Sequence, residues 1–520
     1  MHPFFGLKNK LIITYFIMFK NFHGYHLLES YHHWKQEHRM NRNPLGMKGL
    51  KIAIAVIVTL LLWFVPASCY GLTQINLIEQ RVIGIFAFAA LMWLFDAVPA
   101  WTTSMVVVVL LLFATSNSAL WFLQTDSAGV KFENLVKYKD ILACFADPTI
   151  MLFIGGFIIA IAATKSGLDV KLAKTMLAPF GSKSENVLLG FLLVTGLFSM
   201  FISNTATAAM MLTFLAPVLK ALPADGKGKI GLALAIPIGA NIGGMGTPIG
   251  TPPNAIALKY LNDPEGMNLG IGFGQWMMVM VPLTIVLLIV AWYMLRIFFP
   301  FKQKTIHLEI EDNHKSDWRN YVVYVTFTIT ILLWLTDSIT GVNANVVAML
   351  PVGVFAISGV ITKRDLEEIS WSILWMIAGA FALGVALNQT GLAQHLIEAI
   401  PFASWSPLMV IIGSGLICYL MANFISHTAT AALFVPILAI VGTNMDSLAV
   451  YGGVGTLLIG VAVCSSVAMV LPISTPPNAL ADATGLIKQK DMVKTGLFMG
   501  FFGLLLGYIV LIISGKYGIL

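Results

Sequence analysis

Two short polar motifs occur twice in this chain, once in each half, and every copy lies inside strongly apolar sequence. The first motif reads Ser-Asn-Thr-Ala-Thr-Ala-Ala at 203–209 and Ser-His-Thr-Ala-Thr-Ala-Ala at 426–432. The second reads Thr-Pro-Pro-Asn-Ala, at 251–255 and again at 475–479. Paired polar, proline-broken segments in two halves of a hydrophobic chain indicate a secondary transporter built from inverted repeats, with its binding site at the breaks.

Composition identifies the broad class of protein. The 520 residues are 58% hydrophobic and only 11% charged, where soluble domains have about 25% charged residues. With a mean hydropathy of +0.84, we expect an all-α, multi-pass integral membrane protein. The net charge of +6 could suggest nucleic-acid binding. The basic residues lie in short loops between apolar segments instead, so we expect a lipid bilayer and no nucleic acid as the partner.

Runs of about 20 apolar residues predict about 11 transmembrane helices and two re-entrant hairpins. Residues 47–147 are expected to hold the first three spans, the third near 101–123. The two repeats then follow: 148–300, with a hairpin at 186–220 and a broken helix at 230–261, and 320–520, with a hairpin at 406–442 and a broken helix at 451–484. The repeats also share Ile154-Gly155-Gly156-Phe157 and Ala378-Gly379-Ala380-Phe381, which extends the similarity beyond the motifs.

Residues 1–46 do not fit this pattern. Their apolar run at 11–19 is too short to span a bilayer, and their six histidines have no ligand-like spacing. We expect this N-terminal extension to be disordered, or to lie upstream of the natural start, for which Met47 is the candidate.

The distribution of positive charge predicts the orientation in the membrane. If the N-terminus is cytoplasmic and each hairpin re-enters without crossing, most loop lysines and arginines fall on the cytoplasmic side. These residues cluster at 165–183, 220–229, 302–319, 363–364 and 488–494. The two hairpins then enter from opposite sides, as an inverted repeat requires, and a bacterial inner membrane is the expected location.

The hairpin tips carry the chemistry of a cation and an anion site. Ser and Thr hydroxyls, amide oxygens and carbonyls freed by proline are hard oxygen ligands for a small cation, and helix N-termini favour a carboxylate. Neither tip and neither Thr-Pro-Pro-Asn segment contains Lys or Arg. A buried dianion therefore needs accompanying cations, so sodium and an organic anion are expected to bind cooperatively.

With these motifs, the chain resembles the divalent anion:sodium symporter family, the sodium/dicarboxylate and sodium/citrate cotransporters. The resemblance rests on Ser203–Thr205 and Ser426–Thr428, on both Thr-Pro-Pro-Asn segments, on Ile154–Phe157 and on Asp96-Ala97-Val98-Pro99. It implies a homodimer in which each protomer has a fixed scaffold and a moving transport domain, formed by the hairpins and broken helices, that works as an elevator.

The resemblance also implies the binding residues. One sodium site would use Ser199, Ser203, Asn204 and the Gly250 carbonyl. The carboxylates would contact the following residues: Asn204, Thr205, His427, Thr428 and the backbone around Pro476. A second, degenerate sodium site would retain Ser426 and Ser474.

The second site departs from the family pattern. The position that corresponds to Ser199 is Ala422, which has no hydroxyl, and the second Asn of the family is His427. Three interpretations stay open. His427 could be a neutral substrate donor, could carry a coupling proton in place of the second sodium, or could be structural and turned away from the cavity.

Other functions are weighed against sodium-coupled uptake of C4-dicarboxylates such as succinate, malate or fumarate. A proton-coupled symporter or a dicarboxylate exchanger would use His427. A sodium/proton antiporter would need an acidic residue in the broken helices, and neither motif provides one. We expect no enzyme, because paired catalytic carboxylates, His-Glu-x-x-His and Gly-x-Ser-x-Gly do not occur. Citrate, 2-oxoglutarate and sulfate are not distinguished from the C4 acids.

Overall fold

The computed structural model describes residues 45–70, 75–126, 128–222, 226–263, 266–306, 317–392, 394–395 and 405–519. The predicted N-terminal extension lies outside these residues, except for Leu45 and Gly46, which begin the first described helix. The described residues form helices joined by loops, with isolated β-bridges as their only extended pairing.

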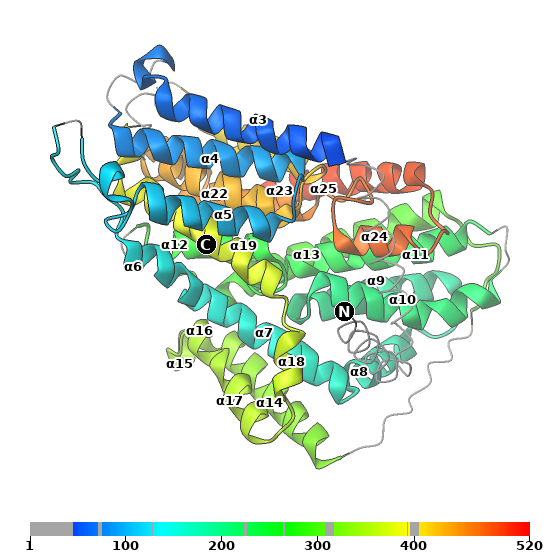
Figure 1. The fold of residues 1–520 in the computed structure, drawn as a ribbon. Helices are drawn as coiled ribbons and strands as arrows, with labels where there is room; N and C mark the ends of the chain where they lie inside the picture. The colour runs from blue at the N-terminus through cyan, green and yellow to red at the C-terminus, as the bar shows by residue number, and fades with distance from the viewer. Residues whose placement is uncertain are drawn as a thin grey trace, which may run out of the picture.

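Figure 1 shows the described helices in the order of the chain, from blue near the N-terminus to red near the C-terminus. Those before residue 300 are α3 Leu45–Phe64, α4 Leu77–Phe95, α5 Ala100–Ala114, α6 Tyr138–Ala143, α7 Pro148–Lys165, α8 Leu168–Leu177, α9 Ser184–Phe201, α10 Asn204–Ala221, α11 Gly228–Gly244, α12 Pro252–Leu261 and α13 Phe273–Phe298. Those after it are α14 Trp318–Leu335, α15 Asp337–Thr340, α16 Ala344–Val347, α17 Met349–Ile357, α18 Lys363–Glu367, α19 Trp371–Gln389, α21 Pro407–Ala422, α22 His427–Thr443, α23 Gly453–Ser466, α24 Pro476–Asp482 and α25 Gln489–Lys516.

Seven stretches of the described chain are long and apolar enough to cross a membrane: α3, α4, α6 with α7, α9, α13, α19 and α25. Further apolar helices of 10–17 residues are α5, α16 with α17, α21, α22 and α23. The span expected near 101–123 is shorter than predicted. Its helix ends at Ala114, and the backbone that follows pairs with a later loop: the Val136 N–H donates to the Thr115 carbonyl, and the Asn117 N–H donates to the Val136 carbonyl.

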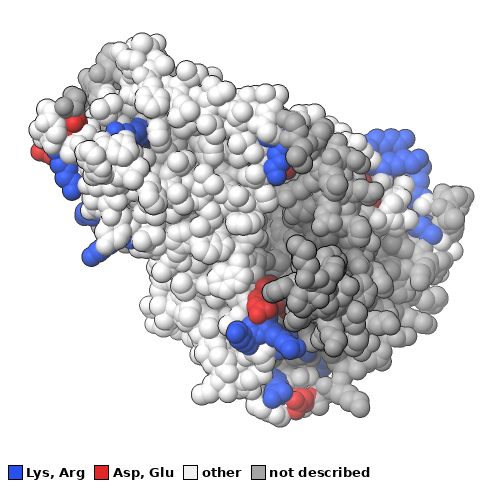
Figure 2. Space-filling view, in the orientation of Figure 1, with Lys and Arg blue, Asp and Glu red and all other residues white. Residues whose placement is uncertain are grey.

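The surface is consistent with a bilayer around the middle of the molecule. In Figure 2 the charged side chains gather in patches toward the ends, and a broad surface of uncharged residues lies between them. Helix α3 illustrates this surface: Ile57 and Leu61 are each 55% exposed. A surface with this many exposed apolar side chains is stable when the side chains face lipid.

Elements of the two halves pack across each other in the centre. Helix α9 lies along α11, while α10 packs against α24 of the second half. Reciprocally, α12 packs against α22 and α23. Each helix pair of one half therefore contacts the interrupted helix of the other, and all the breaks lie in one region.

Candidate functional site

The site of the first half begins where two helices touch through their backbones. A Cβ atom added to Gly243 of α11 would lie 2.2 Å from the carbonyl oxygen of Gly196 in α9, so only glycine permits this approach. The contact brings the Ser199 hydroxyl to the Ala240 carbonyl, to which it donates a hydrogen bond of 2.7 Å. Ser199 is completely buried there.

Asn204 completes a cluster of oxygens at this contact. It is the first residue of α10, and its side-chain amide lies 2.6 Å from Ser199 Oγ, whose one hydrogen is donated to Ala240. With its nitrogen facing this contact, the amide donates to Ser199 Oγ at 2.6 Å, to the Gly250 carbonyl at 3.1 Å and to the Ala240 carbonyl at 3.3 Å, so each group has a partner without an ion. With Oδ1 facing the contact instead, four oxygens converge without a donor between the carbonyls and Oδ1. That arrangement is favourable only when a cation lies among them.

Gly244 leaves the space for this cluster. A Cβ atom at this position would lie 2.6 Å from Asn204 Oδ1 and 3.1 Å from the Gly250 carbonyl oxygen. Gly244 is the last residue of α11, so the helix ends where the cluster needs room. The backbone of the broken helix therefore forms one side of the cluster.

The connection between α11 and α12 is held by its own polar groups. The Asn254 amide donates to the carbonyls of Gly244 at 3.1 Å and Thr247 at 2.8 Å. The Thr247 hydroxyl accepts from the Gly250 backbone N–H at 3.1 Å and donates to the Met200 carbonyl of α9. The Asn of the Thr-Pro-Pro-Asn motif thus fixes the turn that presents the Gly250 carbonyl.

The other predicted residues of the first tip have different positions. The Ser203 hydroxyl caps α10 by accepting the Ala206 N–H at 3.3 Å, the usual role of serine before a helix. Thr205 is half-buried in the first turn of α10. The structure thus brings Ser199, Asn204 and the Gly250 carbonyl together, while the Ser203 hydroxyl caps the helix.

The second half repeats the geometry with different chemistry. His427 begins α22 as Asn204 begins α10, and its Nε2 lies 2.8 Å from the Ala468 carbonyl oxygen. Aligning Thr475 with Thr251 pairs Ala468 with Gly244 and Ser474 with Gly250. Two positions of the first half carry an alanine here. Ala468 takes the position of Gly244, whose hydrogen left room for the cluster, and Ala422 takes the position of Ser199, whose hydroxyl formed a hydrogen bond. The imidazole Nε2–H donates to this carbonyl, so a ring donor lies in the second half where the Asn204 amide lies in the first.

The remaining predicted residues of the second half line this tip. Ser426 caps α22 by accepting the Ala429 N–H at 3.1 Å. The Ser474 hydroxyl donates to the Leu471 carbonyl at 2.8 Å. Thr428 is 8% exposed, whereas Pro476 is exposed at the start of α24. Among the described residues, neither the Ser426 hydroxyl nor the Ser474 hydroxyl forms a hydrogen bond with His427.

Sequence reasoning did not identify the Ala240 carbonyl, Gly244 and Asn241 as parts of these sites. Asn241 of α11 is 1% exposed, and its amide contacts the second Thr-Pro-Pro-Asn motif. A signal for it exists in the sequence, because it is an isolated amide between apolar residues and glycines. The carbonyl has no such signal, since every residue carries one.

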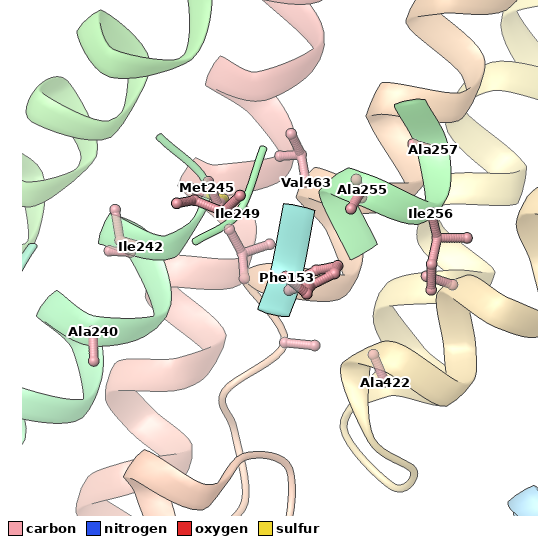
Figure 3. Packing of buried hydrophobic residues seen from close by; sticks show 14 of the residues in the cluster. Phe153, Ala240, Ile242, Met245, Ile249, Ala255, Ile256, Ala257, Ala422 and Val463 are labelled. Carbon is pink, nitrogen blue, oxygen red and sulfur yellow. The ribbon is translucent and has the colours of Figure 1, made fainter. Parts of the chain in front are cut away.

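Apolar side chains seal the interrupted helix from the other side. Figure 3 shows Phe153 of α7 among Met245 and Ile249 of the connection and Ala255 of α12. Phe153 and Met245 are 3% and 0% exposed. The connection between α11 and α12 thus lies beside a tightly packed apolar layer, which excludes water from one flank.

Comparison with known protein families gives a match to the citrate transporter family (CitMHS) over residues 90–452. An uncharacterized transporter of Haemophilus influenzae is 29% identical over 479 residues, 87% of this chain and 95% of the relative. The sodium-dependent dicarboxylate transporter SdcS of Staphylococcus saprophyticus is 28% identical over 505 residues, 89% of this chain and 90% of the relative. SdcS of a Staphylococcus aureus strain is also 28% identical, over 456 residues, 80% of this chain and 82% of the relative.

Two solved structures share the fold at low sequence identity. The YdaH transporter of Alcanivorax borkumensis has a TM-score of 0.54 at 11% identity, covering 83% of this chain and 98% of its own. MtrF of Neisseria gonorrhoeae, described among antimetabolite efflux pumps, has a TM-score of 0.53 at 14% identity, covering 83% and 97%. Together with the apolar helices, these matches confirm a multi-pass membrane transport protein rather than an enzyme.

Proposed function

Because this chain belongs to the citrate transporter family, we propose that it takes up di- or tricarboxylate anions together with sodium, with C4-dicarboxylates such as succinate, malate and fumarate as the main substrates. The names of the SdcS relatives, sodium-dependent dicarboxylate transporters, support both the ion and the substrate class. The predicted binding residues fit this function in the first half more completely than in the second.

The observation that carries the proposal is the cluster of neutral oxygens around Asn204. Ser199 Oγ, Asn204 Oδ1 and the carbonyls of Ala240 and Gly250 meet in one buried place. Hydroxyl, amide and carbonyl oxygens suit a hard monovalent cation better than a transition metal. A sodium ion there would also turn the amide of Asn204 into its oxygen-facing orientation, which leaves the amide nitrogen for a carboxylate.

The carboxylate would lie at the tips of α10 and α22. Both helices present free backbone N–H groups at their N-termini, where anions are stabilised. Thr205 and Thr428 lie in these first turns, and Pro476 is accessible at the neighbouring turn. Without a Lys or Arg in the motifs, the charge of bound sodium offsets the cost of burying the anion.

The proposed scaffold and transport domain meet at an ion pair. Lys259 of α12 lies 2.5 Å from Asp147, the residue before α7, and 5.0 Å from the centre of the Phe381 ring in α19. In the proposed elevator, α12 moves with the hairpins while α7 and α19 stay in place, in a homodimer with a cytoplasmic N-terminus. The contact between Lys259 and Asp147 would then exist in one state of the cycle only.

Cross-linking tests this motion. In a background with Cys144 replaced by Ser, which removes a neighbouring thiol, Asp147→Cys with Lys259→Cys is bridged by a short bifunctional thiol reagent. Uptake by the doubly substituted protein should fall to background on cross-linking, because α12 can no longer move past α7. Each single Cys variant, treated alike, should keep its uptake. Unchanged uptake with complete cross-linking would contradict an elevator that separates these residues.

Transport in proteoliposomes tests the function itself. Radiolabelled succinate should accumulate when sodium is outside and should not when choline or potassium replaces it. Citrate, sulfate and 2-oxoglutarate are offered as competitors to define the substrate class. Equal uptake under a potassium gradient would reject sodium coupling, and uptake that needs internal dicarboxylate would indicate an exchanger.

A second candidate function is favoured by one observation, the replacement of the second cation position by His427, Ala422 and Ala468. If His427 carries a proton, the protein is a proton-coupled symporter or an exchanger. The hydrogen bond from Nε2–H to the Ala468 carbonyl forms with a neutral and with a protonated imidazole alike, so the pH dependence of uptake is the property that distinguishes the two functions.

The paired substitution His427→Asn with Ala422→Thr separates the two functions. For a neutral His427 we expect uptake by the natural protein to change less than about twofold between pH 6 and 8, and the double variant to keep that flat profile. Its sodium dependence should become steeper if a second ion enters. A sigmoidal rise of uptake around the ordinary imidazole pKa of about 6.5, lost in the double variant, would establish proton coupling instead.

A further inference from the structure

Asn241 is a residue of α11 with a buried side-chain amide. The hydrogen bonds of this amide are all made to residues in the other half of the chain. Its Nδ2 donates to Thr475 Oγ1 at 3.2 Å and to Asn478 Oδ1 at 3.1 Å, while its Oδ1 has no partner among the described residues. Asn241, Thr475 and Asn478 are 1%, 4% and 2% exposed. Buried hydrogen bonds of this kind are costly to leave unmade, so the side chain fixes the two residues that it contacts.

Those two residues control the turn that leads into α24. Thr475 Oγ1 accepts the Asn478 backbone N–H at 3.2 Å, and the Asn478 amide donates to the carbonyls of Met469 at 2.8 Å and Leu471 at 3.1 Å. The exposed Pro476 lies between them in the chain. Asn241 therefore positions the turn at which a carboxylate is proposed to bind.

The residue before Asn241 belongs to the proposed sodium site. The carbonyl of Ala240 accepts the Ser199 hydroxyl at 2.7 Å and lies 3.3 Å from the amide of Asn204. The carbonyl of Ala240 and the side chain of Asn241 come from adjoining residues at the C-terminal end of one helix. Any cation that draws the Ala240 carbonyl toward itself also fixes the backbone from which the Asn241 amide reaches Thr475.

The opposite half lacks this connection. The position that corresponds to Asn241 in α23 is Ser465, whose buried hydroxyl has no partner among the described residues. The Oδ1 of Asn254, which corresponds to that of Asn478, is likewise without a partner there. The hydrogen-bonded link thus runs in one direction, from the half with the complete oxygen cluster to the turn of the other half.

We propose that Asn241 is a positioning residue that couples sodium binding at Ser199, Asn204 and Gly250 to carboxylate binding at the Thr475–Pro476 turn. Sodium bound to the Ala240 carbonyl orders the end of α11, and Asn241 then holds the turn in its binding conformation before the anion arrives. By linkage, the bound anion raises sodium affinity by the same factor. This inference rests on the proposed sodium-coupled function.

Binding of radiolabelled succinate to the purified full-length protein tests the coupling. The dissociation constant is measured in saturating sodium and with sodium replaced by choline. In the natural protein we expect sodium to tighten succinate binding by about 5- to 150-fold. Asn241→Ala should reduce this ratio by about 3- to 30-fold, because sodium bound at the first site no longer changes the conformation of the anion site. The serine of Asn241→Ser keeps a polar side chain in the buried position, so we expect this variant to fold. Its side chain is too short to reach Thr475, so we expect the same loss of the sodium effect.

One matched variant serves as the control. Ser465→Ala removes the hydroxyl at the corresponding position, which bonds to nothing among the described residues, and should leave the sodium effect within about twofold of the natural value. If the Asn241 variants bind succinate with the full sodium effect, the inference is wrong. If the natural protein itself shows no sodium effect on succinate, the proposed function has failed instead.

Discussion

Replacing Asn204 by alanine should reduce sodium-driven succinate uptake at least about 100-fold. The side chain touches the Ser199 hydroxyl and faces two carbonyls, and its loss removes a ligand oxygen and leaves Ser199 with one partner fewer. Hydrogen bonds to charged groups contribute about 1.5–3 kcal/mol, and each 1.4 kcal/mol is tenfold in affinity. Because the same amide is proposed to serve ion and anion, both losses combine in transport.

A matched control is Asn444→Ala, at the other end of a hairpin helix. Asn444 is exposed at the C-terminus of α22, and its amide donates only to the last turn of that helix and its neighbour. Its variant should transport like the natural protein. Uptake by a folded Asn204→Ala protein at more than about a tenth of the natural rate would show that Asn204 is not at the centre of the site.

Replacing Gly244 by alanine should weaken sodium binding by about 5- to 150-fold, the range expected for overpacking by 1–3 kcal/mol. The added methyl group would lie 2.6 Å from Asn204 Oδ1 and 3.1 Å from the Gly250 carbonyl oxygen, so the oxygens must separate. The backbone of Gly244 suits alanine, since its φ is not positive, and the effect is therefore one of volume. The measurement is the sodium concentration that gives half-maximal succinate uptake.

Gly413→Ala is the control for the glycine substitution. Gly413 lies inside α21 with nothing within 4 Å of an added Cβ atom, and alanine favours a helix. Its sodium dependence should match that of the natural protein. Equal sodium dependence of the Gly244→Ala protein would mean that the ion binds elsewhere.

The sequence by itself determined the class of protein and the kind of site. Its hydropathy requires helices in a membrane, and the Thr-Pro-Pro-Asn motifs locate the interruptions, because proline ends one helix and begins the next. A comparison of the two halves of the sequence alone shows Ala422 at the position that corresponds to Ser199, and His427 at the position that corresponds to Asn204. These features can be inferred from hydropathy, proline positions and motifs, each of which is contained in a short segment of the sequence.

Helix ends were less predictable. Helix α5 stops at Ala114, although the apolar run continues toward residue 123. Hydropathy measures only whether a segment tolerates lipid, and it does not register backbone pairing with a loop further along the chain, such as that of Ser116 with Val136.

Only the tertiary structure decided which backbone atoms join the site. The Ala240 carbonyl enters the oxygen cluster because Gly196 and Gly243 allow two helices to touch, and no residue type at position 240 announces that role. Likewise, Asn241 contacts Thr475, 234 residues further along the chain, because α11 packs against α24. Contacts between distant segments depend on how helices pack as solid bodies, and that information is shared among many residues rather than held in any motif.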